Sequence, residues 1–183
     1  VYYAKLRNEI LSVDDPAAPG TSLSSNVDQT IHAGLEALVG ASLPFGASGA
    51  HRIEPLLNLT LNRFSFDGDR RWGDNRLSAA PRHALRAEAL YRHAGGFFFG
   101  PTVDVVGKRY ADFANSYQIP SYTLWGLRAG YTLRNWEIHG EARNLGDKDF
   151  IARHSVTAQS GPDAAILSPG EPRSVYVGAR LRF

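Results

Sequence analysis

The chain has 183 residues, of which 43% are hydrophobic and 21% charged, so it is long enough for one domain with a sizeable core and is not a disordered chain. It has no run of about 18 apolar residues, which excludes a helical membrane bundle. The formal net charge of +2 gives no indication of nucleic-acid binding, and the absence of cysteine excludes disulfides, thiolate metal sites and cysteine nucleophiles.

Alternation of apolar and polar residues is the main local signal, and it predicts eight strands. A period of two places the apolar residues on one face and the polar, often charged, residues on the other. The apolar sets in chain order are Tyr2, Ala4, Leu6 and Ile10; Ile31 to Val39; Leu57 to Leu61; Leu85 to Tyr91; Phe97 to Val105; Trp125 to Leu133; Trp136 to Ala142; and Val175 to Phe183.

The length of these segments favours strands that cross a membrane. Many exceed the usual length of about 5–6 residues for strands of globular proteins. Apolar-out and polar-in strands suit lipid around a wet interior. A soluble β-barrel that binds a ligand stays open as an alternative, because it also places charges on one face.

The connections between the strands alternate in length. Long connections rich in Gly, Pro, Asp, Asn and Ser are predicted at 14–26, 67–81, 112–120 and 150–172, and shorter ones at 44–51, 94–96 and 134–135. Short periplasmic turns and long extracellular loops are typical of outer-membrane barrels. The predicted fold class is therefore all-β: an antiparallel transmembrane β-barrel segment of about eight strands.

Several segments resemble the TonB-dependent outer-membrane receptors. Residues 144–150, Asn-Leu-Gly-Asp-Lys-Asp-Phe, are close to the family's Asn-Leu-Phe-Asp-Lys-x-Tyr, with Gly146 and Phe150 as departures. Residues 169–178 and the terminal Phe183 also fit the family's last loop and strand. Weaker similarities lie at 7–10, 81–83, 111–116 and 120–124.

The resemblance implies that residues 1–183 are the C-terminal β-barrel portion of a longer receptor. Members carry a plug domain and a TonB-contacting segment before a barrel of about 22 strands, and this sequence lacks the plug and the N-terminal strands. The implied function is TonB-dependent transport of a ferric siderophore or similar scarce nutrient across the cell outer membrane of a Gram-negative bacterium. A complete small eight-stranded barrel with an anchoring or adhesion role is the alternative.

The implied partners follow from the same resemblance. They are the ferric siderophore or similar ligand, the TonB complex through the missing N-terminal region, outer-membrane lipids and the barrel-assembly machinery, with no nucleic acid. The last strand, with Tyr176 and the terminal Phe183, resembles the signal that the assembly machinery reads.

No enzymatic activity, cofactor or metal site is expected. The six histidines show no metal-ligand spacing, and no Gly-x-Ser-x-Gly motif marks a catalytic serine. His139 lies between Glu137 and Glu141 on one polar stripe, which suits either a metal or proton site or, as we favour, an ordinary charged lining.

The outer loops are better candidates for ligand contact. Clustered arginine beside an aromatic ring suits an anionic, partly aromatic metal chelate, through charge-assisted hydrogen bonds and stacking. The alternative is that these loops are merely solvated or contact lipopolysaccharide phosphates. The predicted substrate-binding residues are Arg70, Arg71, Trp72, Arg109, Tyr110, Asn115, Arg153 and His154.

Overall fold

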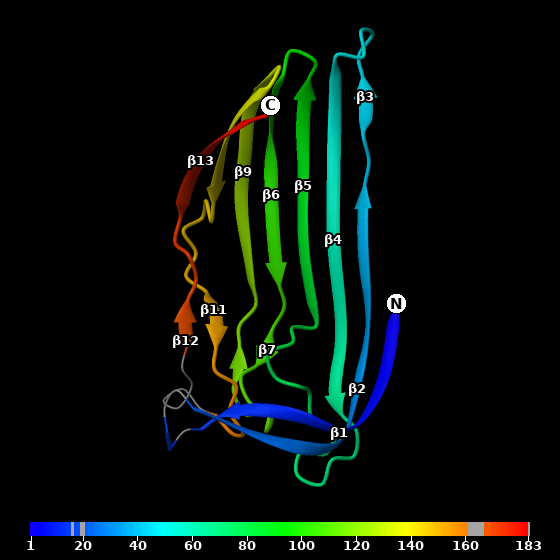
Figure 1. Ribbon diagram of the computed structural model, residues 1–183, viewed down its shortest axis with the longest axis vertical. Helices are drawn as coiled ribbons and strands as arrows, with labels where there is room; N and C mark the ends of the chain where they lie inside the picture. Colours follow the sequence, from blue (N-terminus) through cyan, green and yellow to red (C-terminus); the bar gives the residue numbers. More distant parts are fainter. Residues whose placement is uncertain (16, 19–20, 161–166, 183) are drawn as a thin grey trace.

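The computed structural model describes residues 1–15, 17–18, 21–160 and 167–182. Among them, no helix is long and apolar enough to cross a membrane. Eight antiparallel strands form one curved sheet in the order β1-β2-β4-β5-β6-β9-β10-β13 (Figure 1). Their bounds are β1 (Tyr2–Asp14), β2 (Ser22–Gly40), β4 (His51–Phe66), β5 (His83–His93), β6 (Phe97–Val106), β9 (Tyr122–Leu133), β10 (Trp136–Arg143) and β13 (Ser174–Leu181).

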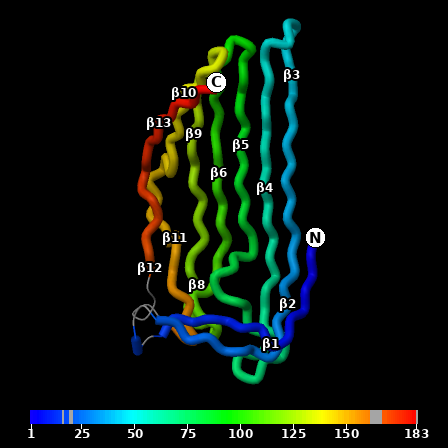
Figure 2. Tube along the Cα trace, in the orientation of Figure 1, coloured from blue at the N-terminus to red at the C-terminus, as the bar shows by residue number. Residues whose placement is uncertain are grey.

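This sheet confirms the predicted all-β antiparallel fold and its eight strands. Strands β1 and β13 are its two edges, and no pairing between them occurs in the described residues. The sheet is therefore a curved, open part of a barrel wall (Figure 2).

Five further strands are short. β3 (Leu43–Phe45) pairs with the beginning of β4. The other four form two small hairpin sheets inside long connections: β7 (Arg109–Tyr110) with β8 (Gln118–Ile119), and β11 (Ile151–His154) with β12 (Leu167–Pro169).

The connections lie at two opposite rims of the sheet (Figure 1). The turn rim carries the connections around residues 41–50, 94–96 and 134–135. The loop rim carries 67–82 and 107–121, together with the described parts of the connections after β1 and after β10. One predicted loop is shorter than expected, because the β1–β2 ladder continues to the pair Asp14 and Ser22. Residues 22–26 were predicted as loop because three of them are serine and one is asparagine, residue types that are common in loops. This hairpin bends across the loop rim (Figure 2).

The two faces of the sheet differ in chemistry, as the alternation predicts. In β9, Trp125 and Leu127 are exposed on one face, whereas Gly126 is buried and Arg128 half-buried on the other. Ion pairs follow the second face, including Arg128 with Glu88 at 2.6 Å. The sheltered polar face is the hollow side of the wall, and the exposed apolar face is the side that suits lipid.

The first half of β1 has the orientation opposite to the predicted one. Tyr2 pairs with Gly34 and donates a hydrogen bond to Oδ1 of Asn62 at 2.8 Å, so its side chain lies on the polar face. Further along β1, Glu9 also contacts His32 on this face. Asn8 between them has a φ of 54°, and this left-handed backbone breaks the strict alternation.

Candidate functional site

The loop rim has a small hydrophobic core of its own. Val27, Phe66, Leu77 and Phe113 are buried together, and partly buried residues pack against them: Leu11, Val13, Phe64, Trp72 and Val156. The members come from the β1–β2 hairpin, the end of β4 and three long loops. The loops therefore form one packed body, on which any ligand-binding residue has a defined position.

Asp112 joins two of these loops from inside. It is fully buried, and its carboxylate accepts the backbone N–H groups of Ser116 at 3.0 Å, Tyr117 at 3.2 Å and Ser160 at 3.1 Å. The hydroxyl of Ser116 donates to the same carboxylate. These hydrogen bonds tie residues 116–117 to Ser160, so Asp112 fixes both backbone segments.

Asn115, predicted as a ligand contact, joins two loops in the same way. Its Nδ2 donates to the carbonyl of Arg76 at 2.9 Å, and its Oδ1 accepts the N–H of Arg76 at 2.9 Å. Asn115 has a φ of 56°, a conformation that asparagine tolerates better than most residues. Its amide is thus engaged by protein backbone.

The turn 69–73 presents the arginines and tryptophan of the predicted site. Asp69 accepts the N–H groups of Arg71 at 2.8 Å and Trp72 at 2.9 Å, which closes the turn. The guanidinium of Arg71 lies 4.5 Å from the centre of the Trp72 ring, whose other contacts are the core rings of Phe66 and Phe113. The turn therefore presents the exposed guanidinium of Arg71 over the Trp72 ring, and the core rings of Phe66 and Phe113 fix the position of that ring.

Arg70 points away from that core. Its Nε lies 3.0 Å from Oδ2 of Asp28, and its side chain is 90% exposed. The hydrogen bonds from Arg70 lower the pKa of Asp28, so this pair stays ionised at neutral pH. Asp28 accepts hydrogen bonds from Nε and Nη2 of Arg70. A guanidinium has five N–H donors, so the remaining donors of Arg70 are available to another anion.

The side chains of Arg109 and His154 are packed between the loops and do not lie on the outer surface of the loop rim. Arg109 is only 6% exposed and donates from Nη2 to the carbonyl of Ile151 at 2.7 Å. Its Nη1 and the Nε2 of His154 are buried without a hydrogen-bond partner among the described residues. Burial lowers the pKa of His154, and the positive charge of Arg109 lowers it further. Tyr110 is half-buried, whereas Arg153 is exposed.

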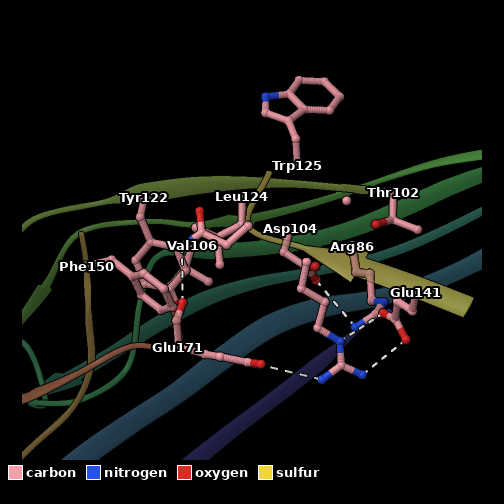
Figure 3. A pocket seen from close by; sticks show the side chains of 13 residues that line it. Arg86, Thr102, Asp104, Val106, Tyr122, Leu124, Trp125, Glu141, Phe150 and Glu171 are labelled. Atoms are coloured by element: carbon pink, nitrogen blue, oxygen red, sulfur yellow. Dashed lines mark hydrogen bonds and ion pairs between the residues drawn. The ribbon is translucent and has the colours of Figure 1, made fainter. Parts of the chain in front are cut away.

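A second group of residues surrounds a cavity of about 350 Å³ below the last loop, on the polar face (Figure 3). Arg143 lies 3.0 Å from Glu141, and Arg86 lies 3.8 Å from the same carboxylate. The rings of Tyr122 and Phe150 meet at 4.5 Å between centroids. The sequence predicted Glu141 and Arg143 only as part of a charged lining. It did not predict the cavity, because the cavity forms only where Phe150 and Glu171 of the last loop fold back over the sheet.

The motif at 144–150 closes this cavity. Asn144 is 3% exposed and donates from Nδ2 to the carbonyls of Lys148 at 3.0 Å and Glu171 at 3.1 Å. Asn144 and Asp147 both have a positive φ, near 48° and 49°. The motif is therefore a rigid turn that holds the two arms of the last loop together.

The described residues contain no group of three or more side chains able to hold a metal ion. The loop rim instead offers exposed cations, an aromatic ring and carbonyl groups. This arrangement can bind a preformed anionic complex through charge and stacking.

Comparisons with known proteins agree on one family. The family model described as "TonB dependent receptor-like, beta-barrel" matches residues 1–145. The ferrioxamine receptor of Yersinia enterocolitica is 27% identical over 124 residues, which are 62% of this chain and 17% of that protein. The chain thus spans less than a fifth of the length of this relative.

Solved structures share the fold. The ferric citrate transporter FecA, in the unliganded form, is 20% identical with a TM-score of 0.73, over 87% of this chain and 25% of its own. The ferric yersiniabactin uptake receptor FyuA from Yersinia pestis is 18% identical with a TM-score of 0.71, over 99% and 26%. The copper transporter OprC is 18% identical with a TM-score of 0.70, over 99% and 28%.

Replacing the buried carboxylate should release the loops. In Asp112→Ala, the N–H groups of Ser116, Tyr117 and Ser160 lose their shared acceptor, whereas the Ser116 hydroxyl keeps the carbonyl of Ser160 at 2.8 Å. A donor left unpaired away from water costs about 1–3 kcal/mol. Limited proteolysis within 107–121 should become at least about tenfold faster. Asp149→Ala is the matched control, because Asp149 is exposed and its carboxylate makes no hydrogen bond within the described ranges. Equal cleavage rates in the two variants would contradict this role.

The position of His154 predicts a pH dependence. The pKa of His154 is lower in the folded loops than in the unfolded chain, where a histidine pKa is about 6.5. The folded loops therefore keep their full stability above about pH 6.5 and lose stability as the pH falls below it. Hydrogen exchange, corrected for intrinsic rates, should show less protection of β11 at about pH 5 than at about pH 7.5. The dependence should disappear in His154→Gln and persist in His83→Gln, an exposed histidine. If the protection of β11 still depends on pH in His154→Gln, the pH dependence arises from another titratable group.

Proposed function

The chain belongs to the TonB-dependent receptor β-barrel family, and on that basis we propose that it forms part of an outer-membrane receptor that takes up a ferric siderophore or similar scarce nutrient. The family consists of transport receptors of the Gram-negative outer membrane, not of enzymes. The observation that carries the proposal is the family match over residues 1–145, because those residues form most of the sheet.

We propose further that residues 1–183 are the C-terminal barrel portion of a longer receptor. Within the described residues, neither of the edge strands, β1 and β13, has a neighbouring strand on its outer side. Backbone groups cannot stay unpaired in hydrocarbon, so neighbouring strands are required. A longer receptor would supply these strands, a plug domain and the segment that contacts TonB. This accounts for the small share of each relative that the chain spans.

The proposed ligand is an anionic metal chelate bound at the loop rim. The names of the relatives mention ferrioxamine, ferric citrate and ferric yersiniabactin, which are all complexes of iron with a chelator. Arg70, Arg71 and Arg153 expose positive charge at this rim, and Trp72 adds a ring. Arg109, Tyr110, Asn115 and His154 would then act mainly by holding the loops that present these groups.

For biogenesis, we propose that the assembly machinery reads the end of β13 and the terminal residue. Tyr176 lies on the polar face, where Arg143 stacks on its ring at 4.6 Å. Its hydroxyl donates to Glu171. Phe183, the other half of the proposed signal, lies outside the described residues.

Ligand binding by the full receptor tests the proposed function. Ferric hydroxamate, citrate and catecholate complexes are titrated against the detergent-purified receptor, with tryptophan fluorescence as the readout. At least one chelate should bind, and Arg70→Gln/Arg71→Gln should weaken it by about tenfold through loss of charge-assisted hydrogen bonds.

Lys148→Gln serves as the control, because it removes a positive charge from an exposed position in another outer loop. It should bind within about twofold of the unmodified receptor. Absence of binding by every chelate would refute the proposed ligand class. Undiminished binding by the arginine variant would remove the turn 69–73 from the site.

A further inference from the structure

The guanidinium of Arg109 is a buried positive charge between two small sheets of the loop rim. Arg109 belongs to β7, and its side chain crosses to β11, where Nη2 donates to the carbonyls of Ile151 at 2.7 Å and Ala152 at 3.4 Å. The connection 67–82 contacts β7 as well, because the N–H of Ala79 donates to the carbonyl of Tyr110 at 3.0 Å. Three segments of the chain therefore meet around this arginine.

The charge of Arg109 is not balanced by the residues that the structure describes. Both groups that Nη2 contacts are neutral carbonyls, and no carboxylate in the described ranges lies within ion-pair distance of Arg109. The buried carboxylate of Asp112 is engaged instead by backbone N–H groups. Burial lowers the pKa of Arg109, yet an arginine stays charged at neutral pH. A buried ion without an opposite charge has lost hydration free energy that no attraction offsets.

Unused polar groups gather beside this charge. Nη1 of Arg109 and Nε2 of His154 are both buried without a hydrogen-bond partner in the described part of the chain. The two side chains are close together, because Arg109 contacts the carbonyls just before His154 and its charge lowers the pKa of His154. Further along the same connection, the hydroxyls of Thr157 and Ser160 are buried and equally without a partner there. The interior of these loops thus contains a positive charge and polar groups that the protein does not saturate.

We propose that Arg109 binds a small inorganic monoanion, such as chloride, in the interior of the loops between β7 and β11. The anion neutralises the guanidinium and accepts hydrogen bonds from Nη1, for which the described residues supply no acceptor. His154 adds a second donor when its Nε2 carries a proton. The ion would tie β7 to β11 and so stabilise two outer loops.

The enclosure of the site favours a single small ion over a larger anion. Nη1 of Arg109 and Nε2 of His154 are shielded from solvent, so a metal chelate would reach them only if the loops opened. The proposed nutrient contacts lie instead at the exposed Arg70 and Arg71. The inference therefore goes beyond the proposed function, because it concerns the stability of the loops and not the recognition of the nutrient.

The test measures hydrogen exchange of the full receptor in detergent, at constant pH and ionic strength, with either chloride or gluconate as the anion. Gluconate is the comparison because it is too large for an enclosed site. Amides of β7 and β11 should exchange at least about threefold more slowly in about 100 mM chloride, because an ion that binds only the folded loops stabilises them. Amides in the middle of β4, which lies in the wall, serve as the internal reference and should not respond.

Substitutions then identify the group that binds the ion. Arg109→Gln should lose the chloride dependence, whereas Arg109→Lys, which keeps a positive charge, should retain part of it. Lys108→Gln is the matched control, because it removes a positive charge from the adjacent, exposed position, and it should respond to chloride as the unmodified receptor does. Equal exchange rates in chloride and gluconate for the unmodified receptor, or an undiminished chloride effect in Arg109→Gln, would overturn the site.

A direct measurement covers the case in which Arg109→Gln disturbs the loops. Crystals of the unmodified receptor soaked in bromide should show an anomalous scattering peak within about 3.5 Å of Nη1 of Arg109. Ordered loops without such a peak would contradict the proposal. A carboxylate found at that place, from Asp163 outside the described residues or from another part of the receptor, would assign the counter-charge to the protein and equally overturn the ion.

Discussion

The structure depends on one constraint: a strand in hydrocarbon must find all its backbone hydrogen bonds within the sheet. Seven consecutive antiparallel ladders meet this requirement for every strand between the two edges, β1 and β13. Because the ladders fix which side chains share a face, the apolar residues gather on the lipid side and the charged residues on the hollow side. The ion pairs there, such as Arg92 with Glu54, are a consequence of this pairing rather than the reason for the fold.

At the loop rim the constraint no longer applies, and the chain folds like a small soluble protein. It buries Phe66, Leu77 and Phe113 and closes its turns with the side chains of Asp69, Asp112 and Asn144. The result is a rigid platform above the mouth of the wall. Exposed arginines on a fixed platform can select an anionic ligand, because little conformational entropy is lost when the ligand binds.

The sequence was sufficient to predict the eight long strands and the assignment of the rims, because a period of two and alternating connection lengths are local properties. The first half of β1 was predicted on the wrong face, since the left-handed Asn8 leaves no mark in the pattern. Asp112 in a loop reads as solvated, and its burial arises only from contacts with residues distant in sequence.

The alternation of faces in β9 is the most direct test of the account, and the absence of cysteine from the chain makes it practical. Single cysteines at Leu127, Ala129 and Tyr131, and at Arg128 and Thr132, would each carry a spin label in the membrane-embedded receptor. The first set should be reached by oxygen dissolved in lipid and the second by a water-soluble relaxation agent. Accessibility without alternation, or with the two sets exchanged, would contradict a wall with an apolar lipid face and a charged hollow face.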